Sequence, residues 1–240
     1  MEHVLDNPIW NGLNSGNRHL GEGNDYVKLF PVEISTFVGL RDFSPENYMD
    51  LYEKLPLHSE RATFVPRQVT VPSPFELIGG LDIYQMVHDK PVEVPVEVTV
   101  EVTVEELYGN PVIAPLNKSN VPQMLALTKL TNPGPFNSRT IEFGNFYGIF
   151  RNNELVAMAG QRLKVFQYTE VSAVCTHPDY VGNGYARRLL WYQINMIRQQ
   201  SNVPILHVKT DNEGAIRLYE SVGFTIRRAL NVIIFKKAGH

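Results

Sequence analysis

The second half of the chain carries a series of apolar segments whose pattern predicts strands. Alternating or continuous apolar residues mark 146–151, 154–163, 168–176, 204–209 and 224–237. Apolar runs of this length, bounded by turn residues, are typical of strands. Asn152 and Asn153 separate the first two runs. Because asparagine tolerates a positive φ, this pair predicts a two-residue hairpin turn.

Segments with helical spacing lie between these strands. One follows Asn120 and Pro122, and a short one covers 212–224 and is stopped by Gly223. Another begins near Gly184, and its apolar residues fall on one face: Ala186, Leu189, Leu190, Ile194 and Ile197. Helices interspersed with strands predict an α+β fold with a mixed, mostly antiparallel sheet flanked by helices.

The first 90 residues have a less regular pattern. Strand-like runs occupy 34–40 and 62–65, and a mixed apolar segment covers 75–87. Between the first two runs, Ser44 can cap a helix that has Pro45 in its first turn. This strand–helix–strand order suggests an α/β half that is a degenerate copy of the C-terminal fold. It has no glycine-rich turn, so we expect it to be structural or to shape the substrate site.

A low-complexity segment divides the chain. Over 91–106, valine alternates with glutamate, proline or threonine. This period of two predicts an edge strand or a hairpin arm, since the two prolines exclude a central strand; an acidic docking strand is the alternative. We therefore expect an N-terminal half over 1–90, a connector over 91–106 and a C-terminal domain over 112–240.

Composition narrows the classes of function. A net charge of −3 disfavours nucleic-acid binding, and no apolar run is long enough to predict a membrane span. The N-terminus lacks the pattern of a secretory signal. The single cysteine, Cys175, cannot form an intramolecular disulfide, which fits the cytoplasm. The seven histidines show no metal-ligand spacing, so no metal is expected.

The strongest chemical motif joins a strand to a helix. VCTHPDYVGNGYARRLL covers 174–190 and contains Gly182 and Gly184 at the predicted helix start. Glycines let successive backbone N–H groups converge, and the helix N-terminus adds partial positive charge, so the turn suits a phosphate or pyrophosphate. The motif lacks the lysine of a Walker loop. Arg187 stands where a dinucleotide fingerprint needs a small residue.

This motif, followed by ILHVKTDNEGAIRLYESVGF at 205–224, resembles the GNAT superfamily of N-acetyltransferases, especially its longer members with an extra N-terminal half. The resemblance implies a GNAT fold and acetyl-CoA as co-substrate. It also implies that a strand contacts the pantetheine arm, a glycine loop binds the pyrophosphate and an asparagine contacts the arm. Carried over by position, the coenzyme-binding residues are Val174, Cys175, Thr176, Gly182, Asn183, Gly184, Tyr185, Ala186, Arg187 and Asn212.

The loop departs from the family pattern at two positions. Val181 replaces the usual arginine before the first glycine, and Asp179 replaces a glutamine or arginine. Losing a cation near a diphosphate removes affinity, while the backbone donors survive. Arg187 and Arg188, in the first helical turn, could compensate.

The resemblance also supplies candidates for catalysis. Tyr219 matches the family tyrosine that protonates the leaving thiolate, although it could be a packing residue. His207 stands where ribosomal-protein acetyltransferases of this superfamily have a glutamate base, and a neutral imidazole can do the same work near neutral pH. Glu170 is a second candidate base, and ordered water is the alternative to both. Cys175 and His177 do not suggest covalent catalysis, because no third group orients a base.

The expected function is therefore transfer of acetyl from acetyl-CoA to a primary amine by direct attack. The acceptor, a small molecule or a peptide, is not specified by the sequence, and the protein is expected to be a monomer or homodimer. The alternative is a coenzyme A-binding or interaction module that has lost turnover. Val181 favours the alternative, whereas Asn212 and Tyr219 favour the enzyme.

Overall fold

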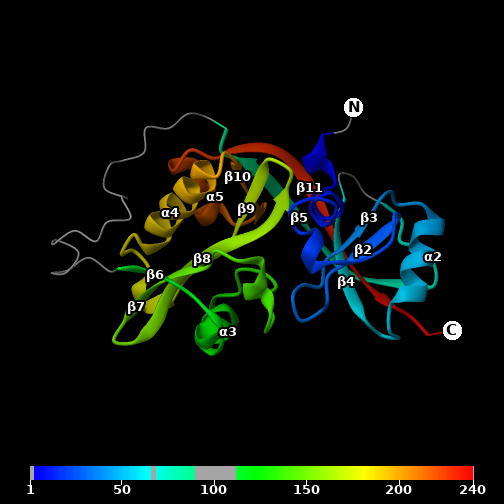
Figure 1. The fold of residues 1–240 in the computed structure, drawn as a ribbon, viewed down its shortest axis with the longest axis horizontal. Helices are drawn as coiled ribbons and strands as arrows, with labels where there is room; N and C mark the ends of the chain where they lie inside the picture. Colours follow the sequence, from blue (N-terminus) through cyan, green and yellow to red (C-terminus); the bar gives the residue numbers. More distant parts are fainter. Residues whose placement is uncertain (1–2, 66–68, 90–111, 240) are drawn as a thin grey trace.

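The computed structural model describes residues 3–65, 69–89 and 112–239 (Figure 1). The connector predicted at 91–106 lies outside the described residues. The α-helices are α1 (Pro8–Leu13), α2 (Pro45–Lys54), α3 (Val121–Thr131), α4 (Tyr185–Gln199) and α5 (Glu213–Ser221). The short 3₁₀ helices are η1 (Val4–Asp6), η2 (Arg18–Leu20), η4 (Lys118–Asn120), η5 (Thr140–Phe143) and η6 (Pro178–Tyr180).

Over the described residues the strands form two sheets. A small antiparallel sheet contains β1 (Glu22–Gly23), β2 (Val27–Leu29) and β3 (Val38–Leu40). The other has eight strands in the order β4-β11-β5-β10-β9-β8-β7-β6. Its strands are β4 (Glu60–Val65), β5 (Phe75–Val87), β6 (Ile113–Pro115), β7 (Tyr147–Arg151), β8 (Glu154–Val165), β9 (Tyr168–Thr176), β10 (Val203–Lys209) and β11 (Thr225–Lys237).

Helices cover both faces of the sheet around β8. Ala157 and Ala159 pack in a cluster with Leu189 of α4, whereas Met158, between them, packs in a cluster with Met124 of α3. Successive strand residues point to opposite faces, so α4 and α3 lie on opposite sides, as Figure 1 shows. The predicted α+β class with a mixed, mostly antiparallel sheet is confirmed.

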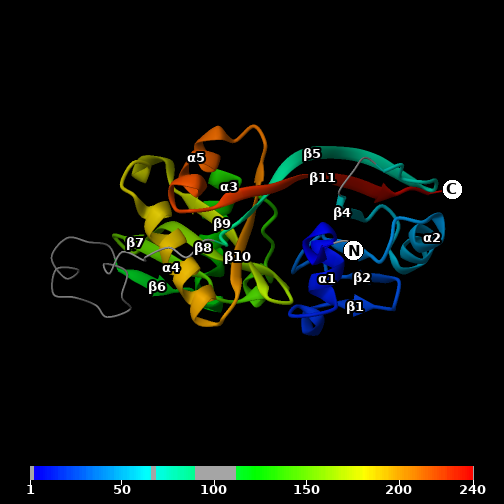
Figure 2. The same ribbon diagram turned by 90° about the horizontal axis from the view of Figure 1, so that it is seen from above.

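The N-terminal half shares the large sheet. β5 lies between β10 and β11, antiparallel to both, and β4 pairs with the outer edge of β11. Figure 2 shows β5 and β11 running side by side from the C-terminal strands to the N-terminal elements. The suggestion that this half is a degenerate copy of the C-terminal fold is not confirmed. Its separation at the connector as a domain stays a prediction.

Several local predictions can be compared with the structure. Asn152 and Asn153 both have positive φ, which confirms the hairpin turn. Ser44 caps α2 by accepting a hydrogen bond from the Asn47 N–H. The strand expected over 34–40 is limited to 38–40, because Ile34 closes a turn onto the Pro31 carbonyl. The mixed segment at 75–87 is one continuous strand of 13 residues.

Candidate active site

The opening between β9 and β10 is the central feature of the site. These two parallel strands pair only from Tyr168 to Glu170 on β9 and from Val203 to Ile205 on β10. Both strands then continue and diverge. On its other side β9 bulges, with three steps from Ser172 to Cys175 opposite two on β8, and Ala173 has a φ of 52°. Bulges of this kind redirect a strand and are over-represented beside active sites.

The glycine loop stands at one end of this opening, at the start of α4. Gly182 and Gly184 have φ of 90° and 74°, and a Cβ on either would meet no atom within 4 Å. Within the described residues, the backbone N–H groups of 182–187 have no hydrogen-bond acceptor, and no side chain caps α4. Unpaired donors, open space and a helix N-terminus fit a diphosphate. The loop can therefore hold the pyrophosphate of coenzyme A.

Two positions beside the glycine loop, 181 and 187, determine whether a cation lies near it. Val181 is 70% exposed, so its position contributes no cation but has room for one. The Arg187 guanidinium donates to the Ser221 hydroxyl across 3.2 Å, which holds it beside the C-terminal end of α5. Arg187 therefore lies near the loop with one of its donors engaged.

The glycine loop gives a direct test of coenzyme placement. Gly184→Val is expected to weaken coenzyme A binding at least about tenfold, because a branched side chain is strained at positive φ and would fill the space left for phosphate. Isothermal calorimetry measures the affinity. Gly144→Val is the matched control, since Gly144 also has positive φ and open space but lies outside the loop. Equal affinities of the Gly184 variant and the unmodified protein would exclude this placement.

The strand residues predicted to bind the pantetheine arm, 174–176, have different surroundings. Val174 lines the opening. Cys175 is buried among core residues, and burial raises the pKa of its thiol to about 11. A thiol that stays protonated at neutral pH is a poor nucleophile, which agrees with the absence of covalent catalysis from the expected mechanism. The Thr176 hydroxyl is buried and has no hydrogen-bond partner among the described residues.

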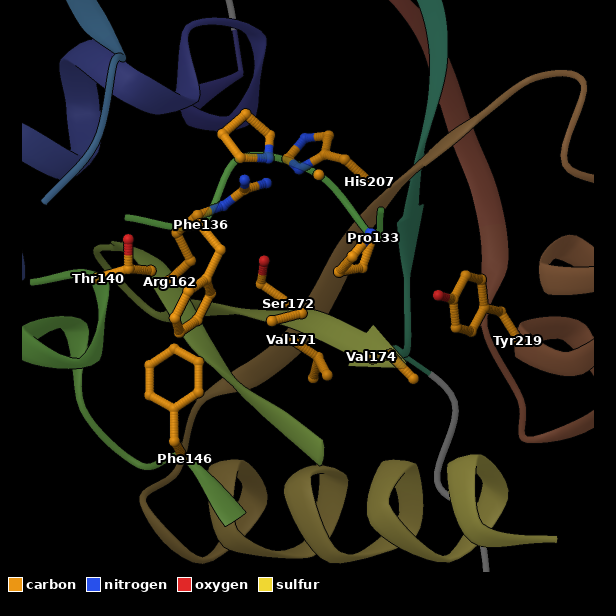
Figure 3. A pocket seen from close by; sticks show the side chains of 13 residues that line it. Pro133, Phe136, Thr140, Phe146, Arg162, Val171, Ser172, Val174, His207 and Tyr219 are labelled. Atoms are coloured by element: carbon orange, nitrogen blue, oxygen red, sulfur yellow. The ribbon is translucent and has the colours of Figure 1, made fainter. Parts of the chain in front are cut away.

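Two clefts meet at Tyr219. The narrow cleft, of about 60 Å³, lies between the 133–136 loop and the β9 bulge. The wide cleft, of about 350 Å³, extends from Tyr219 and Asn212 to the strands of the N-terminal half. Figure 3 shows the Tyr219 hydroxyl directed into the narrow cleft, with Val174 on β9 and Pro133 on the loop across from it. Burial raises the pKa of Tyr219 to about 12, so its hydroxyl stays protonated at neutral pH.

Asn212 is the N-cap of α5. Its Oδ1 accepts a hydrogen bond from the Ala215 N–H, so the cap role is present. Asn212 also lines the wide cleft. Its amide nitrogen has no hydrogen-bond partner within the described residues. Capping and contact with a pantetheine arm are therefore compatible.

A buried ionic network surrounds Glu170. Arg162 donates to both carboxylate oxygens, at 2.6 and 2.9 Å, and His207 Nδ1 lies 2.7 Å from Oε1. The Leu163 N–H is a further donor. Although burial alone would raise the pKa of Glu170, Arg162 and His207 hold it far below its ordinary value. A fully buried carboxylate with so low a pKa and four donors does not suit a general base.

The second nitrogen of His207 is also engaged. Gln85 Nε2 lies 3.0 Å from His207 Nε2. The orientation of the Gln85 amide is fixed, because its oxygen accepts from Arg227 and its nitrogen also donates to the Leu5 carbonyl. His207 Nε2 must then accept, which leaves the proton on Nδ1 to be donated to Glu170. His207 lines both clefts, but neither ring nitrogen is free.

This arrangement separates the predicted catalytic residues. Tyr219 and His207 both line the narrow cleft, as Figure 3 shows, and both also line the wide cleft. Glu170 is fully buried and is the partner of Arg162 and His207. Sequence reasoning missed Arg162 and Gln85. A buried polar residue on a strand has no local signal that distinguishes it from an exposed one. The catalytic roles of Tyr219, His207 and Glu170 all stay predictions, and the contacts of Glu170 favour a role in positioning His207.

Comparisons with known proteins agree with this geometry. The FR47-like protein family matches residues 146–232. A putative GNAT-family acetyltransferase from Novosphingobium aromaticivorans, a solved structure, is 32% identical, covers 99% of this chain and 100% of its own, and superposes with a TM-score of 0.86. The [ribosomal protein bS18]-alanine N-acetyltransferase of Salmonella typhimurium is 30% identical over 127 residues, covering 48% of this chain and 84% of that protein.

A third relative matches over a shorter span. The N-alpha-acetyltransferase RimI of Mycobacterium tuberculosis is 38% identical over 97 residues, which cover 38% of this chain and 60% of that protein. The chain belongs to the GNAT family of acetyltransferases. The family uses acetyl-CoA as acetyl donor. Among the described residues, none of the helices has the length and apolar character needed to cross a membrane.

Proposed function

We propose that this protein transfers the acetyl group of acetyl-CoA to a primary amine by direct attack. The observation that carries the proposal is the meeting of three features around one opening. They are the N–H groups of 182–187, which have no acceptor in the described part of the chain, the divergence of β9 from β10, and the protonated hydroxyl of Tyr219. The first can hold a diphosphate, the second can admit an extended arm, and the third faces the cleft where that arm would end.

The proposed reaction needs one bond to form, one to break and one proton to move on each side. The amine nitrogen forms a bond to the thioester carbon, the carbon–sulfur bond breaks, and the amine loses one proton while the thiolate gains one. The β9 bulge lines the narrow cleft, and backbone N–H groups around Ala173 and Val174 would donate to the carbonyl oxygen as it becomes negative. Tyr219 donates its proton, or a hydrogen bond, to the departing sulfur.

The buried network bears on which group accepts the amine proton. Both nitrogens of His207 are engaged, and Glu170 is held ionised by Arg162 and His207 beneath the cleft. These contacts support water as the acceptor of the amine proton. His207 lines the clefts that such a water would occupy. His207 would become the base only if it exchanged its Gln85 contact for the amine.

The second candidate function is a coenzyme A-binding module without turnover, which the missing cation at Val181 and the engaged His207 favour. A thiol-release assay with acetyl-CoA and a broad panel of amines separates the two. Amine-dependent thiol release is expected, with one equivalent of coenzyme A bound per chain by calorimetry. Stoichiometric binding with no release above the rate of hydrolysis, for any amine, would establish the module instead.

A further inference from the structure

The wide cleft has two chemically different ends. Asn212 and Tyr219 stand at the end next to α5 and the expected donor. The other end is built by β4, β5 and β11, together with Thr36 and Phe37 just before β3. We propose that this second end is the acceptor subsite and that it selects an amine attached to an apolar side chain. The inference rests on the proposed function and adds the class of acceptor to it.

The floor of the subsite is a continuous apolar surface. The strand register places Phe64 of β4 opposite Val232 of β11, and Val232 opposite Leu81 of β5. The next row on the same face joins Ala62 to Ile234. All five residues line the cleft. Three neighbouring strands therefore present apolar residues to one space, which excludes water from a bound apolar group.

An aromatic wall connects this floor to the polar network. The Phe37 and Phe64 rings meet edge to face with centroids 4.9 Å apart, and Phe64 meets the His207 ring at 4.9 Å. The Arg162 guanidinium lies over Phe37, 4.8 Å from the ring centroid. The Phe37–Phe64 pair is therefore held on one side by Arg162 and on the other by His207. The wall is therefore a preformed surface against which an apolar side chain can pack.

The charges around the wide cleft oppose a polycationic acceptor. Glu60 is the single carboxylate among the described residues that line it, against Arg61, Lys209 and Arg162, and Arg162 is neutralised by its ion pair with Glu170. Glu170 is fully buried and has all its donors from the protein. A polyamine or aminoglycoside would bring several ammonium groups to a site with an excess of positive charge. A monoamine with an apolar body meets no such penalty.

One cleft contains both the apolar floor and the reacting centre at Tyr219. His207 and Val208 of β10 line it between Tyr219 and the β5–β11 floor. An amine held near Tyr219 would therefore place a side chain on its α-carbon over Leu81 and Ile83. The geometry favours an α-amino compound with a branched or aromatic side chain.

Matched acceptors test the class. Leucinamide and alaninamide have similar amines and differ in three apolar carbons, and kcat/KM for leucinamide is expected to exceed that for alaninamide by about tenfold or more. Spermidine is expected to be the poorest of the three. A leucine-headed tetrapeptide, compared with leucinamide, distinguishes a peptide N-terminus from a free amino-acid derivative. Either source supports the proposal.

A paired substitution tests the location. Leu81→Glu puts a carboxylate on the floor and is expected to remove the preference for leucinamide and to raise kcat/KM for spermidine. The control is Leu77→Glu on the same strand, where Leu77 is 56% exposed and outside both clefts. Leu81→Ala, which adds no charge, is expected to reduce the ratio of leucinamide to alaninamide and to leave the coenzyme A affinity unchanged.

The outcomes separate this inference from the proposed function. Thiol release that is equal for leucinamide and alaninamide, or faster with spermidine, would overturn the apolar subsite and leave the acetyltransferase in place. An unchanged preference in both Leu81 variants would also overturn it. Failure of every amine, with coenzyme A still bound, would overturn the proposed function and the subsite with it.

Discussion

Replacing Glu170 with glutamine is expected to lower the free energy of unfolding by about 3–5 kcal/mol, the usual effect of removing one partner from a buried ion pair. The side chain of Glu170 is 1% exposed and that of Arg162 is 13% exposed. A glutamine at this position would place an amide N–H against donors from Arg162 or His207 and leave the guanidinium without its counterion. Urea denaturation measures the loss.

A second arginine–glutamate pair provides the control. Arg139 contacts Glu142 with the same two-point geometry, at 2.7 and 2.8 Å, but their side chains are 49% and 25% exposed. Because water already solvates that pair, Glu142→Gln is expected to cost no more than about 1 kcal/mol. Similar losses in the two variants would show that the buried network contributes no more than a surface ion pair.

The effect of Glu170 should depend on pH in one direction. Its pKa is held well below the ordinary value of 4.5, so the ionised carboxylate stabilises the folded state fully above that value. The contribution is lost as the pH falls through the lower pKa of the folded state. The stability difference between the unmodified protein and Glu170→Gln should therefore be largest near neutrality and shrink below about pH 4. Urea denaturation curves of both proteins, recorded near neutral pH and below about pH 4, provide the measurement.

Local features of the fold and site could be predicted from the sequence. The glycine turn and the Asn152–Asn153 hairpin depend on positive φ, which few residue types tolerate, so the sequence itself marks them. Asn212 and Tyr219 lie on one short helix, and their spacing therefore fixes their geometry. Each of these predictions rests on residues that are close along the chain.

The long-range features could not be predicted in this way. The insertion of β5 between β10 and β11 joins residues more than 100 positions apart, such as Gln85 and His207. The same pairing brings Gln85 to the second nitrogen of His207, and the pairing of β4 with β11 carries Phe64, whose ring contacts that of His207. The sequence makes Glu170 a candidate base because it gives the position of the carboxylate but not its surroundings. Its role depends on Arg162 and His207, which only the folded sheet brings together.

Tyr219→Phe is expected to lower kcat by about 10²–10⁴-fold, the usual contribution of a general acid. The substitution removes one oxygen and retains the ring that packs against Phe224. The dissociation constant for coenzyme A should change little, because binding depends on the backbone donors of 182–187. Steady-state thiol release gives kcat, and calorimetry gives the affinity. Circular dichroism checks that the variant is folded.

Tyr192→Phe is the matched control for this experiment. Tyr192 on α4 also has a pKa raised to about 12, chiefly by burial, yet it contacts Tyr147 and lies outside both clefts. It should therefore leave kcat unchanged. The pKa of Tyr219 is raised to about 12, so its ionisation should not limit the rate between about pH 7 and pH 10. The unmodified protein and Tyr192→Phe should therefore show the same dependence of kcat on pH in that range. A near-normal kcat in Tyr219→Phe would make Tyr219 a packing residue and assign protonation of the thiolate to water.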